Sequence, residues 1–191
     1  MKRRALVAGA GVALLLAACG KQEAQQAPAK QEPVSLDVIA GEAKGFDVGT
    51  TMAAHVVYVF FDPQCPHCAE LWESARPLKP QARFVWIPVG LLNAKSAPEG
   101  AAILAAPDPV AAMDQHEASM RAHQGGIATE GVSQDLVAAV KHNTELMNRF
   151  GFGGVPTIVA KQARTGELLT LEGALPTQPL AEKLGLLPPT S

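Results

Sequence analysis

Two cysteines separated by two residues, Cys65 and Cys68, are the side chains of this sequence best suited to chemistry. They follow residues 56–61, which are all β-branched or aromatic, a composition typical of a strand buried on both faces. The turn residues 62–64 come next, and Pro66 suits the first position of a helix because its missing N–H would be unpaired there anyway. The spacing therefore predicts that Cys65 lies at a helix N-terminus, with Cys68 one turn further in.

This arrangement favours thiol–disulfide exchange, in which the attacking species is a thiolate. The positive end of a helix dipole and the unpaired N–H groups there stabilise a thiolate, and His67 could lower the pKa of Cys65 further. Cys68 begins an apolar stripe at i, i+3, i+4 and i+7 spacing, which faces a protein core and includes Trp72. We therefore predict an exposed, attacking Cys65 and a covered Cys68 that resolves the mixed disulfide.

The alternative is that the two cysteines are structural or form half of a metal site. A structural zinc site needs four ligands, and the sequence contains no second CxxC or HxxxH pattern. The five histidines are scattered without ligand spacing. The net charge of −2 and the 18% of charged residues give no sign of a nucleic-acid partner. We expect redox chemistry without a metal or another cofactor.

The first eighteen residues have the pattern of a signal peptide. Basic residues at 2–4 precede an uncharged apolar run at 5–18, which at fourteen residues is shorter than the ~20 needed to span a bilayer. The run ends in Leu16-Ala17-Ala18-Cys19, which resembles the lipoprotein box of bacterial lipoproteins. That resemblance implies that Cys19 is acylated and becomes the new N-terminus. The alternative is an ordinary signal peptide cut near Ala18, which leaves Cys19 as a free thiol.

We expect residues 19–45 to form a tether between the membrane and a folded domain at residues 46–187. Residues 21–33 are rich in Gln, Ala, Lys and Glu and contain no large apolar residue, so they cannot bury enough surface to fold. Residues 34–40 could be either a short strand or part of the linker. Residues 46–50 predict either an edge strand or a turn that leads to the central strand.

The remaining pattern predicts an α/β domain in two halves. Residues 84–90 predict a second buried strand, which completes a right-handed βαβ unit with two parallel strands. Helical segments follow within an insertion at about 94–150, and the predicted helices cover 96–106, 109–123 and 133–150. The last part predicts an antiparallel hairpin and a short helix, at 157–161, 167–171 and 177–184.

Val155-Pro156 comes directly before the third buried strand. Proline at the start of a strand normally marks an edge or a bulge. In a protein with a Cys-X-X-Cys pair, a cis-proline at this place would lie opposite the cysteines. It would leave the backbone of Val155 free to pair with a substrate chain, so we predict that Val155 and Pro156 bind the substrate.

This order of elements resembles the thioredoxin-like fold, with a helical insertion between the βαβ half and the cis-Pro ββα half. From about residue 46 to 185 the chain resembles the thioredoxin-like Dsb proteins of the bacterial periplasm. The segments that most resemble DsbG and DsbC are 61–68, 86–90 and 101–105, with Gly154-Val155-Pro156-Thr157 at a matching distance. The resemblance implies cysteine-containing exported proteins as substrates and a DsbB-like or DsbD-like membrane redox partner.

The sequence departs from DsbG and DsbC in two respects. Those proteins carry an N-terminal dimerisation domain, whereas only 26 residues, mostly linker, separate Cys19 from Phe46 here, so we expect a monomer. The dipeptide Pro66-His67 and the Val155 before Pro156 are those of DsbA, the strongly oxidising member.

We therefore predict a lipid-anchored thiol–disulfide oxidoreductase on the periplasmic side of a bacterial membrane. One alternative is a reductase that repairs sulfenylated or mispaired cysteines, and another is a dithiol metal-handling or cytochrome-maturation accessory protein. Asp62 could either handle a proton near Cys68 or cap the turn. Glu70 and Glu73 are expected on a solvated helix face, and Trp72 in the core.

Overall fold

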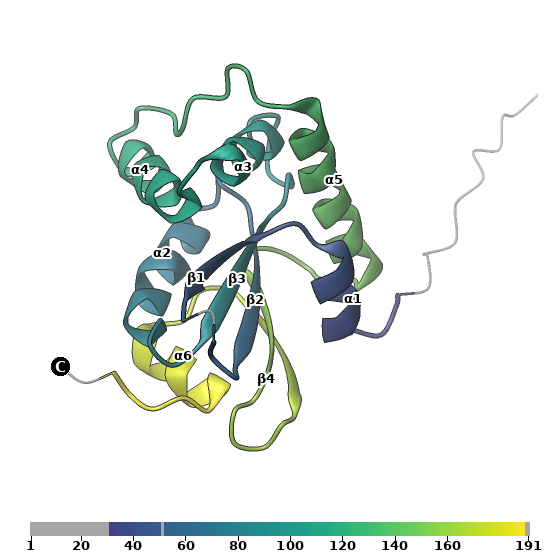
Figure 1. The fold of residues 1–191 in the computed structure, drawn as a ribbon, viewed down its shortest axis with the longest axis vertical. Coiled ribbons are helices and arrows are strands. Elements are labelled where there is room, and N and C mark those ends of the chain that lie inside the picture. The colour runs from purple at the N-terminus through teal and green to yellow at the C-terminus, as the bar shows by residue number, and fades with distance from the viewer. Residues whose placement is uncertain (1–30, 51, 190–191) are drawn as a thin grey trace, which may run out of the picture.

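The computed structural model describes residues 31–50 and 52–189, which form one five-stranded sheet with helices around it (Figure 1). The strand order is β1-β3-β2-β4-β5, and β2 and β3 are parallel whereas the other pairs are antiparallel. The strands are β1 Phe46–Gly49, β2 Val56–Phe61, β3 Arg83–Pro88, β4 Thr157–Lys161 and β5 Leu168–Glu172. The predicted edge strand, βαβ unit and hairpin are thus confirmed.

Helices cover both faces of the sheet. In Figure 1, α2 and α6 lie on one side of the strands, α1 and α5 lie on the other, and α3 and α4 lie beyond the strand ends. The predicted helical insertion is confirmed as α3, α4 and α5. The helices are α1 Leu36–Glu42, α2 Pro66–Ala75, α3 Ser96–Ala105, α4 Pro109–Arg121, α5 Gln134–Arg149 and α6 Thr177–Leu184, and the short 3-10 helix η1 covers Arg76–Leu78.

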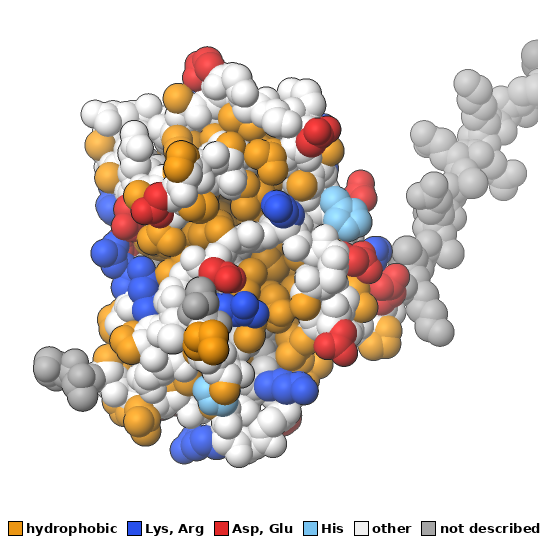
Figure 2. Space-filling model, viewed as in Figure 1, with side chains coloured by type: hydrophobic (Ala, Val, Ile, Leu, Met, Phe, Trp, Pro, Cys, Tyr) orange, Lys and Arg blue, Asp and Glu red, His pale blue; other side chains and the backbone are white. Residues whose placement is uncertain are grey.

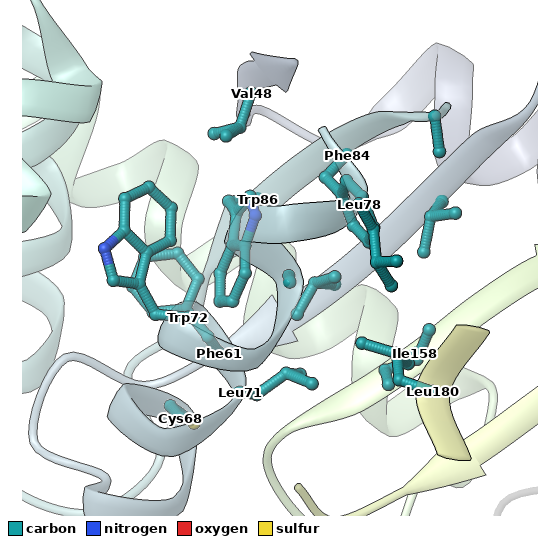
Figure 3. Packing of buried hydrophobic residues seen from close by; sticks show 14 of the residues in the cluster. Val48, Phe61, Cys68, Leu71, Trp72, Leu78, Phe84, Trp86, Ile158 and Leu180 are labelled. Atoms are coloured by element: carbon teal, nitrogen blue, oxygen red, sulfur yellow. The ribbon is translucent and has the colours of Figure 1, made fainter. Parts of the chain in front are cut away.

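The sheet is buried on both faces because side chains of the central strand β2 alternate between two apolar clusters. Val59 and Phe61 pack in the cluster under α2 and α6, whereas Phe60 packs in the cluster under α1 and α5. Trp72 of α2 meets Trp86 of β3 edge-on, with ring centroids 4.9 Å apart (Figure 3). The aromatic contacts fix α2, and therefore the cysteine pair, against the sheet. Trp72 lies in the core, as predicted.

The expectation for residues 34–40 is wrong, because they are neither strand nor free linker. Ser35 caps α1 by accepting a hydrogen bond from the backbone N–H of Val38, and Ile39 of this helix is fully buried. Asp37 in the first turn adds a favourable interaction with the helix dipole. The packed domain therefore begins before residue 46, the predicted boundary.

Asn143 on α5 anchors the insertion to the sheet. Its side-chain amide donates to the carbonyl oxygens of Lys44 and Pro88 at 2.8 and 2.9 Å, and its Oδ1 accepts from the N–H of Lys44 at 2.9 Å. The side chain is fully buried. It therefore joins α5 to the segment before β1 and to the end of β3.

The predicted signal peptide and Cys19 lie outside the described residues. Within residues 31–50 and 52–189, no helix is both long enough and apolar enough to span a membrane. Basic and acidic side chains both occur on the face shown in Figure 2, with hydrophobic side chains between them.

Candidate active site

The cysteine pair stands at the start of α2, as predicted. Cys65 is the N-cap residue with extended backbone angles, Pro66 occupies the first turn, and the N–H of Cys68 donates to the carbonyl of Cys65 at 3.0 Å. Both thiols are free, so this is the dithiol form of the pair. Cys68 is fully buried, but Cys65 is also only 6% exposed. The prediction of an exposed Cys65 is therefore wrong, because neighbouring segments cover most of its side chain.

The surroundings of Cys65 lower its pKa from about 9 to about 6. The largest cause is a hydrogen bond from the Cys68 thiol, which stabilises the thiolate. Burial acts in the opposite direction, and the backbone N–H groups of Cys68 and His67 then lower the pKa again. Cys65 is therefore largely a thiolate at neutral pH, and the thiolate is the form of cysteine that attacks a disulfide.

Cys68 has the opposite tendency. Burial raises the pKa of its thiol far above the ordinary value, and the adjacent Cys65 raises it further. One thiol is therefore largely ionised at neutral pH, and the other stays protonated. This difference is what an attacking and a resolving cysteine require.

His67 contributes less than its place between the cysteines suggests. Its side chain is exposed and its Nδ1 lies 3.1 Å from Oε2 of Glu70, which raises the pKa of His67. Its charge is the last of the causes that lower the pKa of Cys65. His67 therefore adds to an effect that Cys68 and the helix N-terminus dominate.

The loop before β4 lies opposite Cys65. The Val155-Pro156 bond is cis, and the Cys65 sulfur lies 3.6 Å from the carbonyl oxygen of Val155. Thr157, which is fully buried, fixes this loop because its hydroxyl donates to the carbonyl of Gly154 at 2.6 Å. The structure thus places the predicted substrate-binding residues beside the reactive sulfur.

Asp62 acts as the cap of two loops. Its buried carboxylate accepts from the N–H of Gln64 at 2.8 Å, and from the N–H groups of Leu91 and Leu92 at 2.7 and 2.8 Å. These hydrogen bonds hold the turn before Cys65 and the loop after β3 together. Of the two roles considered for Asp62, the capping role accounts for its contacts.

His116 on α4 supports the turn before Cys65 and was missed from the sequence. Its ring is fully buried, with Nε2 donating to the carbonyl of Pro63 at 2.8 Å and Nδ1 accepting from the N–H of Ile127 at 3.1 Å. These partners assign the neutral tautomer that carries its proton on Nε2. Asp108 caps α4 by accepting from the N–H groups of Val110 and Ala111 at 3.0 Å, so the sequence marks the start of the helix but not the side that faces the active site.

A groove with a volume of about 690 Å³ runs beside Cys65 between α2 and α4. Glu70 and Glu73 of α2 line this groove. They were predicted on a solvated helix face, and that face also forms one side of the groove. Glu117 of α4 also lines the groove but is only 2% exposed. Sequence reasoning missed Glu117 too, because an isolated glutamate on a helix carries no sign of burial.

The described residues contain no group of three or more His, Cys, Asp and Glu side chains placed to hold a metal ion. The dithiol pair itself supplies only two soft ligands. The opposite shifts in the pKa values of the two thiols favour exchange between sulfur atoms.

Comparisons with known proteins agree with this geometry. The chain is 36% identical over 145 residues to the thiol:disulfide interchange protein DsbG of Pseudomonas aeruginosa, covering 72% of this chain and 54% of that protein. It is 35% identical over 114 residues to DsbG of Escherichia coli, covering 58% and 45%. The chain thus spans about half the length of these curated relatives.

Solved structures show the same fold. The catalytic domain of Proteus mirabilis ScsC matches with a TM-score of 0.61 at 19% identity, covering 78% of this chain and 95% of that domain. A periplasmic thioredoxin-like protein from Salmonella enterica serovar Typhimurium matches with a TM-score of 0.60 at 17% identity, covering 80% and 99%. Residues 49–187 match the family described as thioredoxin-like domain. This chain belongs to the thioredoxin-like family.

Proposed function

We propose that this protein is a thiol–disulfide oxidoreductase that works through Cys65 and Cys68. The observation that carries the proposal is the opposite ionisation of the two thiols, with the pKa of Cys65 lowered to about 6 and that of Cys68 raised. The carbonyl of Val155 lies 3.6 Å from the Cys65 sulfur, which supports the proposal that it pairs with the backbone of a bound substrate. The relatives named thiol:disulfide interchange protein support the same activity.

The reaction follows from these positions. The Cys65 thiolate attacks one sulfur of a substrate disulfide, forming a mixed disulfide while the second substrate sulfur leaves as a thiolate. Cys68 then loses its proton and attacks the Cys65 sulfur, so the first substrate sulfur leaves and takes up a proton. The substrate is reduced by two electrons and the pair becomes a disulfide. The reverse sequence donates a disulfide to a substrate dithiol.

The stabilised thiolate favours the disulfide-donating direction. A low pKa of the attacking cysteine stabilises the dithiol form and makes the disulfide form a stronger oxidant. Repair of sulfenylated or mispaired cysteines is the alternative, supported by the identity to DsbG. Equilibration with glutathione separates the two, because a donor would lie near about −120 mV and a reductase below about −200 mV.

Substitution of each cysteine tests the assignment. Cys65→Ser should lose exchange with a disulfide substrate completely, because no other described thiol is both ionised and adjacent to Val155. Cys68→Ser should still attack but accumulate the mixed disulfide, which mass spectrometry detects as a mass increase. Normal turnover by Cys65→Ser would contradict the assignment.

We propose that the domain acts on exported cysteine-containing proteins on the periplasmic side, as a monomer tethered through lipidated Cys19 and recharged by a membrane redox partner. The basic and apolar N-terminal residues support export, and the similar Salmonella protein is a periplasmic one. Mass spectrometry of the mature N-terminus tests this, since an unmodified Cys19 would contradict the anchor.

A further inference from the structure

The groove beside Cys65 combines apolar walls with an acidic lining. Apolar surface comes from Pro63, Pro66, Ala69 and Met120, and these residues lie next to the reactive sulfur. The ionisable groups that line the groove are Cys65, Glu70 and Glu73 from α2, Glu117 and Arg121 from α4, and His123 directly after it.

Among these carboxylates, Glu117 is the one whose buried oxygen has no partner. Glu70 lies 3.1 Å from His67, and Glu73 lies 3.8 and 3.7 Å from Arg76 and Arg121. Oε1 of Glu117 is buried and makes no hydrogen bond.

A buried carboxylate without a hydrogen bond costs folding free energy, so its presence in a groove points to a partner that arrives with a ligand. The partner must carry donors, because an ionised carboxylate can only accept hydrogen bonds.

We propose that this groove binds the substrate segment flanking the cysteine that reacts with Cys65, and that Glu117 pairs there with a lysine or arginine of that segment. The inference rests on the proposed function and adds a substrate preference to it. A long cationic side chain suits the site, because its methylene stem can lie along Pro66, Ala69 and Met120 while its charged end reaches Glu117.

Charge complementarity favours a cation over a neutral donor. Three carboxyl groups, those of Glu70, Glu73 and Glu117, line the groove against the one guanidinium of Arg121. An ion pair shielded from water is stronger than one in solvent. A neutral or acidic substrate residue would leave the carboxylate unpaired, which disfavours such substrates.

The pairing should depend on pH in a defined direction. Burial raises the pKa of Glu117 to about 7, against the lowering effect of Arg121, and Cys65 and Glu73 raise it further. The carboxyl group is therefore mostly ionised at pH 8 and mostly protonated at pH 5.5. A preference for cationic substrates that depends on Glu117 should be strong at pH 8 and weak at pH 5.5.

The test uses the purified full chain and cysteine peptides activated as mixed disulfides with 5-thio-2-nitrobenzoate, whose release is coloured. Peptides differ only in carrying Lys, Gln or Glu at each of three positions on either side of the cysteine. At the favoured position the Lys peptide should react about tenfold faster than the Gln peptide at pH 8, and the Glu peptide should react slowest. Both rates depend equally on the ionised fraction of Cys65, so this fraction cancels in the ratio of the Lys rate to the Gln rate. That Lys/Gln ratio should fall towards one at pH 5.5.

Glu117→Gln should bring the Lys/Gln ratio near one at both pH values. Glu145→Gln is the matched control, because it removes one carboxylate from the opposite part of the insertion, where the side chain is 75% exposed, and it should keep the wild-type ratio. The proposal is overturned if Glu117→Gln keeps the preference, or if the wild-type chain shows no Lys preference at any position. Reaction with neutral 2-hydroxyethyl disulfide reports the proposed function separately, so loss of that reaction identifies failure of the function itself.

Discussion

Cys65 lies between two walls that differ in what they offer a substrate. On one side the proline wall, residues 154–157, presents the backbone carbonyl of Val155. On the other side the α4 wall, consisting of His116, Glu117 and Met120, presents side chains to the turn before Cys65 and to the groove.

The difference separates two tasks. A backbone carbonyl can pair with any polypeptide, so the proline wall suits the general chemistry of exchange. Side chains can distinguish one substrate side chain from another by charge and shape, so the α4 wall suits the choice of substrate. The active site thus combines a general half with a selective half.

The α4 wall should contribute more to stability than the proline wall. His116→Ala removes two hydrogen bonds, leaves the Pro63 carbonyl and the Ile127 N–H without partners, and opens a cavity, which together should cost about 3–4 kcal/mol. Thr157→Val removes one hydrogen bond from the proline wall and should cost about 1 kcal/mol. Urea unfolding of the reduced proteins measures both, and equal losses would contradict the comparison.

Glu117 should make the stability of the α4 wall depend on pH. Its pKa is about 7 in the folded protein and about 4.5 in the unfolded chain, so the folded state binds more protons and stability falls as the pH rises from about 4.5 to about 7. The difference between these two pKa values corresponds to about 3 kcal/mol of folding free energy. Relative to the wild type, Glu117→Gln should therefore gain about that much between pH 5 and pH 8 in urea unfolding. Parallel pH profiles of the two proteins would show that the carboxyl group is not buried in solution.

The smallest expected effect concerns which neighbour activates Cys65. Alkylation of the reduced wild-type protein with iodoacetamide should show a midpoint near pH 6. Cys68→Ala should raise the pKa of Cys65 more than His67→Ala, because the hydrogen bond from Cys68 is the largest cause and the charge of His67 the last. A larger shift in His67→Ala would transfer the activating role to the exposed imidazole.

Much of the proline wall and of α2 could be predicted from the sequence, because their signals are local. Pro66 marks the first turn of α2, the run at 56–61 marks a buried strand, and Pro156 marks the start of β4. These residues constrain the backbone of their immediate neighbours in the chain. The sequence therefore predicts the strand and helix boundaries at these places.

The α4 wall could not be predicted, because its contacts join distant segments. His116 forms a hydrogen bond with the backbone carbonyl of Pro63, 53 residues earlier. Every residue type has such a carbonyl, so the residue at position 63 does not indicate that His116 binds it. Helix α1 was missed for a different reason: Ser35 and Asp37 form a recognisable helix start, but the polar composition of the preceding residues favoured a linker.

The contacts of Cys65 also set an order of assembly. Its sulfur pairs with the carbonyl of a residue 90 positions later, and the turn before it depends on His116, 53 positions after Pro63. Such long-range contacts form only after loops of that length have closed. During synthesis, which proceeds from the N-terminus to the C-terminus, Cys65 and Cys68 are therefore exposed before either wall has formed. During that interval both are ordinary thiols, and the protein completes its reactive centre only when nearly all of its domain has emerged.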